Sequence, residues 1–224
     1  MRNLVPHFIL EKYAQGESGG RFQAAGLFAD ISGCSAATHA LGQHGSEAAE
    51  TMAEIMRALL EPLVGQVHAQ GGFITTFAGD AFTALFPGDD PSACRRALAA
   101  ALAIQQHIIA HPVQTTPYGR FPFAIRLGLG QGEAEWGILR PARLSTPRAQ
   151  NAAYFFGGPA VEAAAAAEHL AQAGNLVLSA AIYAQVQGLV RALPLADGHW
   201  RCLLASGELP APQAGPAAAP QDAA

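Results

Sequence analysis

Residues 21–30 read RFQAAGLFAD, and residues 73–87 read FITTFAGDAFTALFP. The first run has the composition of a strand that ends in an acid, Asp30. The second run consists of two strand-like halves separated by Gly79 and Asp80, and a glycine followed by an aspartate between two strands is typical of a tight hairpin. If the first strand pairs beside this hairpin, the carboxylates of Asp30 and Asp80 project from one end of the same sheet.

Helices are predicted between and after these strands. Apolar residues recur at spacings of three or four from Ser46 to Gln70, which gives that segment one apolar helical face. Asp90 and Pro91 suit the cap and the first position of a second helix, and residues 160–171, AVEAAAAAEHLA, have high helix propensity. A short helix is also predicted at residues 6–14, and further strands at residues 123–132, 136–139, 151–156, 176–179 and 199–205. Strands that alternate with helices indicate an α/β fold of the α+β sandwich kind, in which helices pack on a mixed sheet.

The composition limits the classes of protein to which the chain can belong. Of its 224 residues, 50% are hydrophobic and 13% charged, so the chain can bury a core and is not disordered throughout. The formal charge of −4, without a basic run, argues against a dedicated nucleic-acid binder. No apolar run reaches about 18 residues, so no membrane partner is expected. The three cysteines fit neither a disulfide framework nor a zinc site, and a cytoplasmic location is expected.

Three segments are expected along the chain. Residues 1–20 form an N-terminal helix and a linker rich in glycine, residues 21–207 form one domain, and residues 208–224 form a disordered tail rich in proline and alanine.

The two acids suggest a metal site. Carboxylate oxygens suit Mg²⁺ or Mn²⁺, and backbone amides of residues 31–35 that enter a helix could hold a phosphate. Acids for metals beside amides for phosphates are the composition of a phosphoryl-transfer site. The alternative is structural, because aspartate favours turns and caps. Arg126 could reach a phosphate from its strand, or lie at a surface or interface. Cys34 is either a reactive thiol activated by helix-start amides or a buried, inert side chain.

Residues 27–87 resemble the catalytic core of class III nucleotidyl cyclases. That family begins its site with a strand bearing F-x-D-I-x-G-F-[ST], followed by a long helix, a Gly-Gly stop and a hairpin with G-D-[AG]. All these parts occur here in order and at the family's spacing, with Cys34 in place of the second Phe. The runs VPHFILEKYAQG (5–16), RLGLGQGEA (126–134) and the segment 154–179 are similar to the first cyclase domain of bacterial soluble-adenylyl-cyclase-like proteins.

The resemblance implies a fold, related to the palm of polymerases, and a reaction. The ATP 3′-hydroxyl attacks the α-phosphate, and cyclic AMP and pyrophosphate form. Two Mg²⁺ or Mn²⁺ ions would be held by Asp30, Asp80 and the carbonyl of Ile31. The residues expected to face the phosphates are Ser32, Gly33, Cys34, Ser35 and Gly79.

Three positions depart from the family pattern. Thr76 stands where a base-selecting Lys is usual, while Glu162 and Ala166 replace the Asn and Arg that orient the ribose and stabilise the transition state. A homodimer would therefore be at most weakly active, and a complementary cyclase domain is the expected partner. Since the base-reading residues are not in this chain, GTP stays open as a substrate beside ATP. The alternative is a catalytically inactive domain that acts as a nucleotide- or metal-binding regulatory or interaction module.

Overall fold

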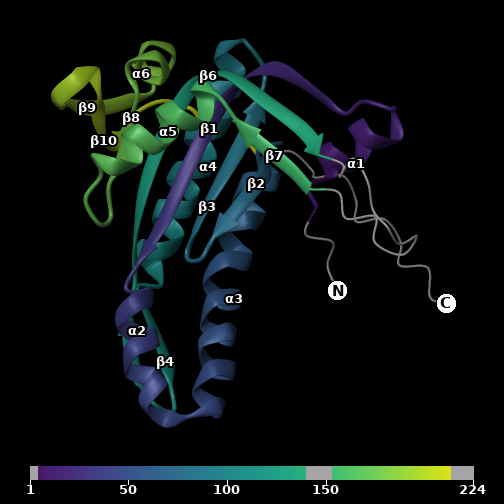
Figure 1. Ribbon diagram of the computed structural model, residues 1–224. Helices are drawn as coiled ribbons and strands as arrows, with labels where there is room; N and C mark the ends of the chain where they lie inside the picture. Colours follow the sequence, from purple (N-terminus) through teal and green to yellow (C-terminus); the bar gives the residue numbers. More distant parts are fainter. Residues whose placement is uncertain (1–4, 140–152, 213–224) are drawn as a thin grey trace, which may run out of the picture.

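The computed structural model describes residues 5–139 and 153–212 of the chain (Figure 1). Its helices are α1 (His7–Ala14), α2 (Cys34–Leu41), α3 (Ser46–Ala69), α4 (Pro91–Ala110), α5 (Pro159–His169) and α6 (Ala180–Val186). Its strands are β1 (Gly19–Ser32), β2 (Phe73–Ala78), β3 (Ala81–Pro87), β4 (Val113–Thr116), β5 (Gly119–Pro122), β6 (Ala124–Leu139), β7 (Ala153–Gly157), β8 (Leu176–Leu178), β9 (Val190–Pro194) and β10 (Trp200–Ala205).

The main sheet is mixed, as the sequence predicts. Its strands lie in the order β2-β3-β1-β6-β8-β10-β9, and β7 also pairs with β6. The pair β6–β8 is parallel and the other pairs are antiparallel. Strands β4 and β5 form a separate two-stranded hairpin. The two longest strands, β1 and β6, pair along their length and form the centre of the sheet.

Helices cover both faces of this sheet. On β1, Ala25, Leu27 and Ala29 face a large core shared with α3 and α4. The alternate residue Ala24 faces a smaller core with Ala160 of α5. Because side chains alternate across a strand, the even-numbered residues of β1, Asp30 included, lie on the α5 face. The two acid-bearing segments are thus held by a sheet that is packed from both sides.

Helix α5 lies unusually close to the strands. A Cβ atom added to Gly26 would fall 2.5 Å from the carbonyl oxygen of Ala160, and one added to Gly130 would fall 2.5 Å from the carbonyl carbon of Ala163. The helix side of this contact is also small, since Ala164 and Ala167 are fully buried. The alternating glycines after Arg126 therefore serve close packing of a helix backbone on a strand backbone.

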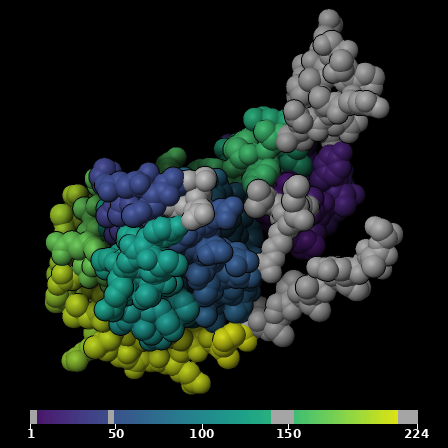
Figure 2. All heavy atoms as spheres, turned by 90° about the horizontal axis from the view of Figure 1, so that it is seen from below, coloured from purple at the N-terminus to yellow at the C-terminus, as the bar shows by residue number. Residues whose placement is uncertain are grey.

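A second part of the molecule projects from the end of the sheet (Figure 1). It consists of α2, the start of α3 and the β4–β5 hairpin, which Figure 2 shows side by side when the molecule is viewed from below. The rings of His44 and Tyr118 contact each other there, with centroids 4.9 Å apart. This extension follows directly from the end of β1, where Asp30 lies.

The N-terminal helix is part of the folded body. Phe8 of α1 packs against four aromatic rings at centroid distances of 5.0–5.8 Å, namely those of Phe22, Phe73, Trp136 and Phe156. Strand β1 begins at Gly19, so the glycine pair assigned to the linker belongs to the sheet.

Several elements differ from the sequence-based expectations. The segments 123–132 and 136–139 form one continuous strand, β6. The helix expected to follow residues 31–35 is α2, whose extent was not predicted, and the elements α6, β4, β5 and β9 were not predicted at all. Strand β7 begins at Ala153, and the first two residues of the expected strand 151–156 lie outside the described residues. Most of the expected tail, 213–224, lies outside them too, whereas Pro210 accepts a hydrogen bond from Gln70 Nε2 at 3.4 Å. The boundaries of the three expected segments stay a prediction. In the described part of the chain, none of the helices is both long and apolar enough to span a bilayer.

Candidate functional site

The strand register brings Asp30 and Asp80 to the same end of the sheet. Asp30 is opposite Ala81 in the β1–β3 ladder, and the backbone N–H of Ile31 donates to the carbonyl oxygen of Asp80 at 3.3 Å. Gly79 closes the hairpin with φ of 66°, a conformation that glycine adopts without strain. Both acids are half-buried. The hairpin and the first strand therefore hold two carboxylate-bearing residues side by side, and their role as metal ligands stays a prediction.

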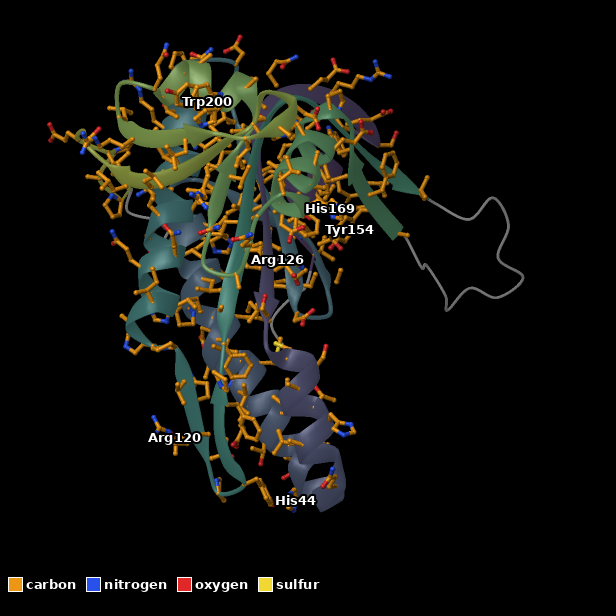
Figure 3. The ribbon with its side chains drawn as sticks, turned by 90° about the vertical axis from the view of Figure 1, so that its left-hand side faces the viewer. His44, Arg120, Arg126, Tyr154, His169 and Trp200 are labelled. Carbon is orange, nitrogen blue, oxygen red and sulfur yellow. The ribbon has the colours of Figure 1, made fainter. Side chains whose placement is uncertain are left out.

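Arg126 lies directly beside Asp30. The two residues are opposite each other in the β1–β6 ladder, and Asp30 Oδ2 accepts hydrogen bonds from both Nε, at 3.1 Å, and Nη2 of the guanidinium. Figure 3 shows Arg126 on the strands near the end of α5 that carries His169. Arg126 is partly at the surface, because its side chain is 38% exposed, but its guanidinium is ion-paired with Asp30.

Glu168 was not predicted from the sequence. It lies in the last turn of α5, and its Oε1 is 3.1 Å from Arg126 Nε. That oxygen is buried and has no hydrogen-bond partner among the described residues, so the guanidinium meets it as an ion pair without hydrogen-bond geometry. Burial raises the pKa of Glu168, and Arg126 opposes that effect. The signal in the sequence was the glycine two positions after Arg126, which lets the helix backbone come close.

Arg126 therefore lies between carboxylates from two elements. Its hydrogen bond with Asp30 raises the pKa of the guanidinium above its ordinary value, with smaller contributions from Glu168 and Asp80. Since an arginine side chain is not deprotonated in proteins, this end of the sheet carries a permanent cation among three carboxylates.

Cys34 is a buried thiol. It is 5% exposed, and its Sγ lies 3.7 Å from Met56 Sδ. Burial raises the pKa of the thiol to about 12, and Asp80 and Asp30 raise it further by repelling the thiolate. Desolvation and the two neighbouring acids oppose the activation that helix-start amides would give. The burial of Cys34 is as the second alternative expects, and its lack of reactivity stays a prediction.

The segment expected to face phosphates lies where β1 gives way to α2. Ser32 ends β1, and Gly33 precedes α2 with φ of 109°. A Cβ at Gly33 would come 3.2 Å from the ring of Phe123 and closer still to the backbone of Pro122. The first N–H groups of a helix have no partner within it. The amides of Cys34 and Ser35 are therefore suited to an anion, and their binding of phosphate stays a prediction.

The three positions that depart from the family pattern are all exposed. Thr76 lies on β2, and Glu162 and Ala166 are one turn apart on α5. Thr76 borders an open cleft of about 380 Å³ together with Tyr154 and Phe155 of β7. None of the three supplies a positive charge to the surface.

The donor set fits a magnesium-type ion. Mg²⁺ is usually held by one or two carboxylates, with water and substrate phosphates as the other ligands. The described residues contain no group of three or more His, Cys, Asp or Glu that could hold a metal, so Asp30, Asp80 and the Ile31 carbonyl would form such a partial set. One condition follows from the structure: a cation that uses Asp30 Oδ2 would compete with the Arg126 guanidinium, which donates two hydrogen bonds to that oxygen.

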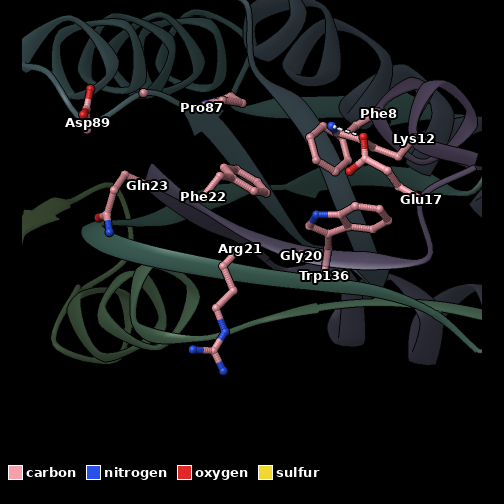
Figure 4. A pocket seen from close by; sticks show the side chains of 11 residues that line it. Phe8, Lys12, Glu17, Gly20, Arg21, Phe22, Gln23, Pro87, Asp89 and Trp136 are labelled. Atoms are coloured by element: carbon pink, nitrogen blue, oxygen red, sulfur yellow. Dashed lines mark hydrogen bonds and ion pairs between the residues drawn. The ribbon is translucent and has the colours of Figure 1, made fainter. Parts of the chain in front are cut away.

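A hollow away from these residues lies beside α1 (Figure 4). It has a volume of about 470 Å³ and is lined by α1 and the start of β1, including Lys12, Glu17 and Arg21. The strand residues that line it, 20–23, are seven to ten positions from Asp30, roughly 23–33 Å along a strand. Lys12 is already bound to Glu17 at 2.9 Å, and Arg21 faces Glu133 at 3.5 Å. Because its cations are neutralised, this hollow is a poor site for a nucleotide phosphate.

Comparison with solved structures identifies the fold. The guanylyl cyclase domain of the RhoGC fusion protein from Blastocladiella emersonii covers 85% of this chain and 99% of that domain, with a TM-score of 0.67 and 19% identity. The guanylate cyclase domain of RhGC from Catenaria anguillulae, solved in complex with GTP, covers 84% of this chain and 100% of its own, with a TM-score of 0.66 and 20% identity. The match with the adenylyl cyclase CyaB from P. aeruginosa covers 86% of this chain and 99% of that protein's chain, with a TM-score of 0.65 and 17% identity. No protein-family model and no curated protein matches the chain. The chain therefore has the fold of class III cyclase catalytic domains, as the resemblance implies.

Proposed function

We propose that this chain is a nucleotidyl cyclase-type domain that supplies the metal-binding half of a site completed by a complementary cyclase domain. The observation that carries the proposal is the position of Asp30 and Asp80, side by side at one end of a sheet with the cyclase fold. The reaction is the conversion of ATP to cyclic AMP and pyrophosphate. GTP is the second nucleotide to be assayed, because solved neighbours include both adenylyl and guanylyl cyclases.

Each part of the site has a role in this proposal. Asp30, Asp80 and the carbonyl of Ile31 would hold two Mg²⁺ or Mn²⁺ ions. Such ions, when bound, lower the pKa of an attacking hydroxyl and neutralise a leaving triphosphate. The amides from Ser32 to Ser35, with Gly79, would orient the phosphates. Cys34 stays protonated at neutral pH and so adds no charge that would repel them.

The other half of the site must come from a partner. Glu162 and Ala166 offer neither an amide nor a cation, and an acid at Glu162 would repel a triphosphate. Losing an arginine that stabilises phosphoryl transfer costs roughly 10³- to 10⁵-fold in rate, or about 4–7 kcal/mol. We therefore expect the homodimer to be almost inactive. A heterodimer with a domain that carries the missing Lys, Asn and Arg would hold one complete site.

Calorimetry with Mn²⁺ tests the metal half. Asp30→Ala and Asp80→Ala should each weaken Mn²⁺ binding at least tenfold, because each removes one of two anionic ligands. Asp89→Ala removes an exposed acid just after β3 and is the matched control, with unchanged binding expected. If both site variants bind Mn²⁺ as the wild type does, the metal site is not where we propose it.

An activity assay separates the two candidate functions. Cyclic AMP and cyclic GMP are measured for the chain alone and mixed with a cyclase domain that carries Lys, Asn and Arg at the complementary positions. Turnover in the mixture that Asp30→Ala abolishes supports the enzyme. The second candidate, a binding module without turnover, is favoured by the exposed Thr76, Glu162 and Ala166. It gains support if Mn²⁺ and ATP bind but every mixture is inactive.

A further inference from the structure

Glu168 and Arg126 form a contact that the proposed reaction does not itself require. Arg126 extends from β6 and contacts two carboxylates, that of Asp30 on the neighbouring strand and that of Glu168 on α5. The side chain of Glu168 is 10% exposed, against 18% for Asp30. A carboxylate that is so buried is stable only when it is paired, and Arg126 is the cation next to it.

The glycine packing of α5 fixes Glu168 in this place. A Cβ atom at Gly128 would fall 2.7 Å from Glu168 Cα and closer still to its backbone nitrogen. Gly128 and Arg126 are two positions apart on β6, so they share one face of the sheet. The backbone of Glu168 is thus pressed against the strand, next to the guanidinium. Glu168 Oε1 is buried and has no hydrogen-bond partner among the described residues, so its contact with Arg126 is the ion pair alone.

Metal binding changes the partners that are left for Arg126. Asp30 cannot keep its two hydrogen bonds from the guanidinium on Oδ2 and also use that oxygen for a divalent cation. A free guanidinium beside a dication would be repelled out of the site, because two positive charges a few ångströms apart repel strongly where water is scarce. The Glu168 carboxylate offsets this repulsion, because it attracts the guanidinium from the side of α5.

We propose that Glu168 is a positioning residue that retains the Arg126 guanidinium at the rim of the site when Asp30 turns to a divalent cation. Arg126 then keeps a carboxylate partner in both states and stays on the sheet beside the acids. The metal-bound state rests on the proposed function, whereas the hold of Glu168 on Arg126 is a property of the ion-free chain. A different role, in which Glu168 attracts the metal directly, makes a different prediction in the absence of Arg126.

Side-chain NMR tests the hold on Arg126 without any metal. With ¹⁵N-labelled arginine, hydrogen exchange at Arg126 Nε is compared in the wild type, Glu168→Gln and Glu54→Gln. Glu54 is an exposed acid on α3 and serves as the control. We expect exchange to be about tenfold faster in Glu168→Gln and unchanged in Glu54→Gln. Equal exchange in the wild type and a folded Glu168→Gln protein would overturn the proposal. If Glu168→Gln does not fold, Glu168→Asp keeps the charge but shortens its reach, and the same comparison applies.

A double-variant cycle with Mn²⁺ tests the metal-bound state. Glu168→Gln should weaken Mn²⁺ binding about tenfold, which is 1.4 kcal/mol, because Arg126 then has only Asp30 as a partner. In an Arg126→Gln background the same change should have no effect. A loss that persists in that background means that Glu168 acts on the metal itself, and the positioning role is overturned. If the wild type binds neither Mn²⁺ nor Mg²⁺, the proposed function fails, and the exchange comparison alone decides whether Glu168 holds Arg126.

Discussion

The contact between α5 and β6 makes a sharp prediction at Gly128. In Gly128→Ala, the added methyl group would lie 2.7 Å from Glu168 Cα and closer still to the carbonyl oxygen of Ala164. Both neighbours are helix backbone, so no side chain can rotate away to make room. The helix must move off the sheet as a body, and Glu168 must move with it.

The size of the effect follows from this geometry. Inserting a methyl group into a packed core costs typically 1–3 kcal/mol, and a clash with backbone lies at or above the top of that range. A glycine-to-alanine change also restricts the unfolded chain, which returns about 0.4–1 kcal/mol. We therefore expect Gly128→Ala to lower the free energy of unfolding by about 2–3 kcal/mol. For a chain of this size the melting temperature falls by roughly 2–4 °C per kcal/mol.

The matched control is Gly65→Ala. Gly65 lies inside α3, and a Cβ atom there would have no neighbour within 4 Å. Because alanine is the better helix former, this variant should be more stable by roughly 0.5–1 kcal/mol. Urea unfolding measures both proteins. If Gly128→Ala keeps wild-type stability while Gly65→Ala gains, α5 does not press on β6, and the place of Glu168 beside Arg126 is wrong as well.

Two further predictions concern the aromatic cluster and the buried thiols. Phe8→Ala should lower the free energy of unfolding by about 3 kcal/mol, because Phe8 packs on four rings. Leu10→Ala, which truncates a side chain that is 41% exposed, should lower it by less than about 1 kcal/mol. Equal losses of the two variants in urea unfolding would contradict the packing of α1 on the sheet. The pKa of the Cys34 thiol is raised from 9.0 to about 12, so this thiol should resist an aromatic disulfide reagent at pH 8 in the folded protein and react with it in urea. Comparison with Cys34→Ala shows how much of the absorbance of the released aromatic thiolate comes from Cys34. Since the unfolded thiol ionises first, its contribution to stability is full below pH 9 and falls as the pH rises toward 12, so urea midpoints that do not fall over that range would contradict the raised pKa.

The elements that the sequence predicts best are those with a local physical cause. The hairpin at Gly79 follows from a two-residue turn that needs a positive φ. The second long helix begins where predicted because the Asp90 side chain accepts a hydrogen bond from the Ala93 N–H at 3.2 Å. Each of these signals acts over a few residues, so it can be read without the rest of the chain.

The elements that were not predicted depend on distant partners. Strand β9 pairs with β10, and Tyr118 and Phe121 of the β4–β5 hairpin pack against the large core. A segment of four or five residues is too short for its hydrophobic periodicity to predict a strand. Helix α6 has a cap at Ser179, whose Oγ accepts from the Ile182 N–H at 3.4 Å, but that signal alone does not distinguish a cap from a turn.

The candidate site was predictable only in part, for the same reason. Asp30 and Asp80 were singled out because each ends or interrupts a strand and because the surrounding motif resembles a known family, and the structure places the two residues side by side. Glu168 was not found because its role depends on two facts outside its own helix, the register of Arg126 beside Asp30 and the bare backbone at Gly128. In the sequence alone it is an ordinary acid near a helix end.

The charges around Arg126 bear on whether the chain is an enzyme half or only a scaffold. A partly buried arginine between two carboxylates is a poor way to stabilise a fold, since apolar residues of similar volume are often as stable or more stable by 1–4 kcal/mol. Stability therefore does not explain why Asp30, Arg126 and Glu168 share this end of the sheet. The departures from the cyclase pattern are at Thr76, Glu162 and Ala166, which are exposed. A chain that served only as a structural scaffold would have no need for the partly buried charges, so their presence favours a domain that binds a cation. Both candidate functions include that binding, and the activity assay decides between them.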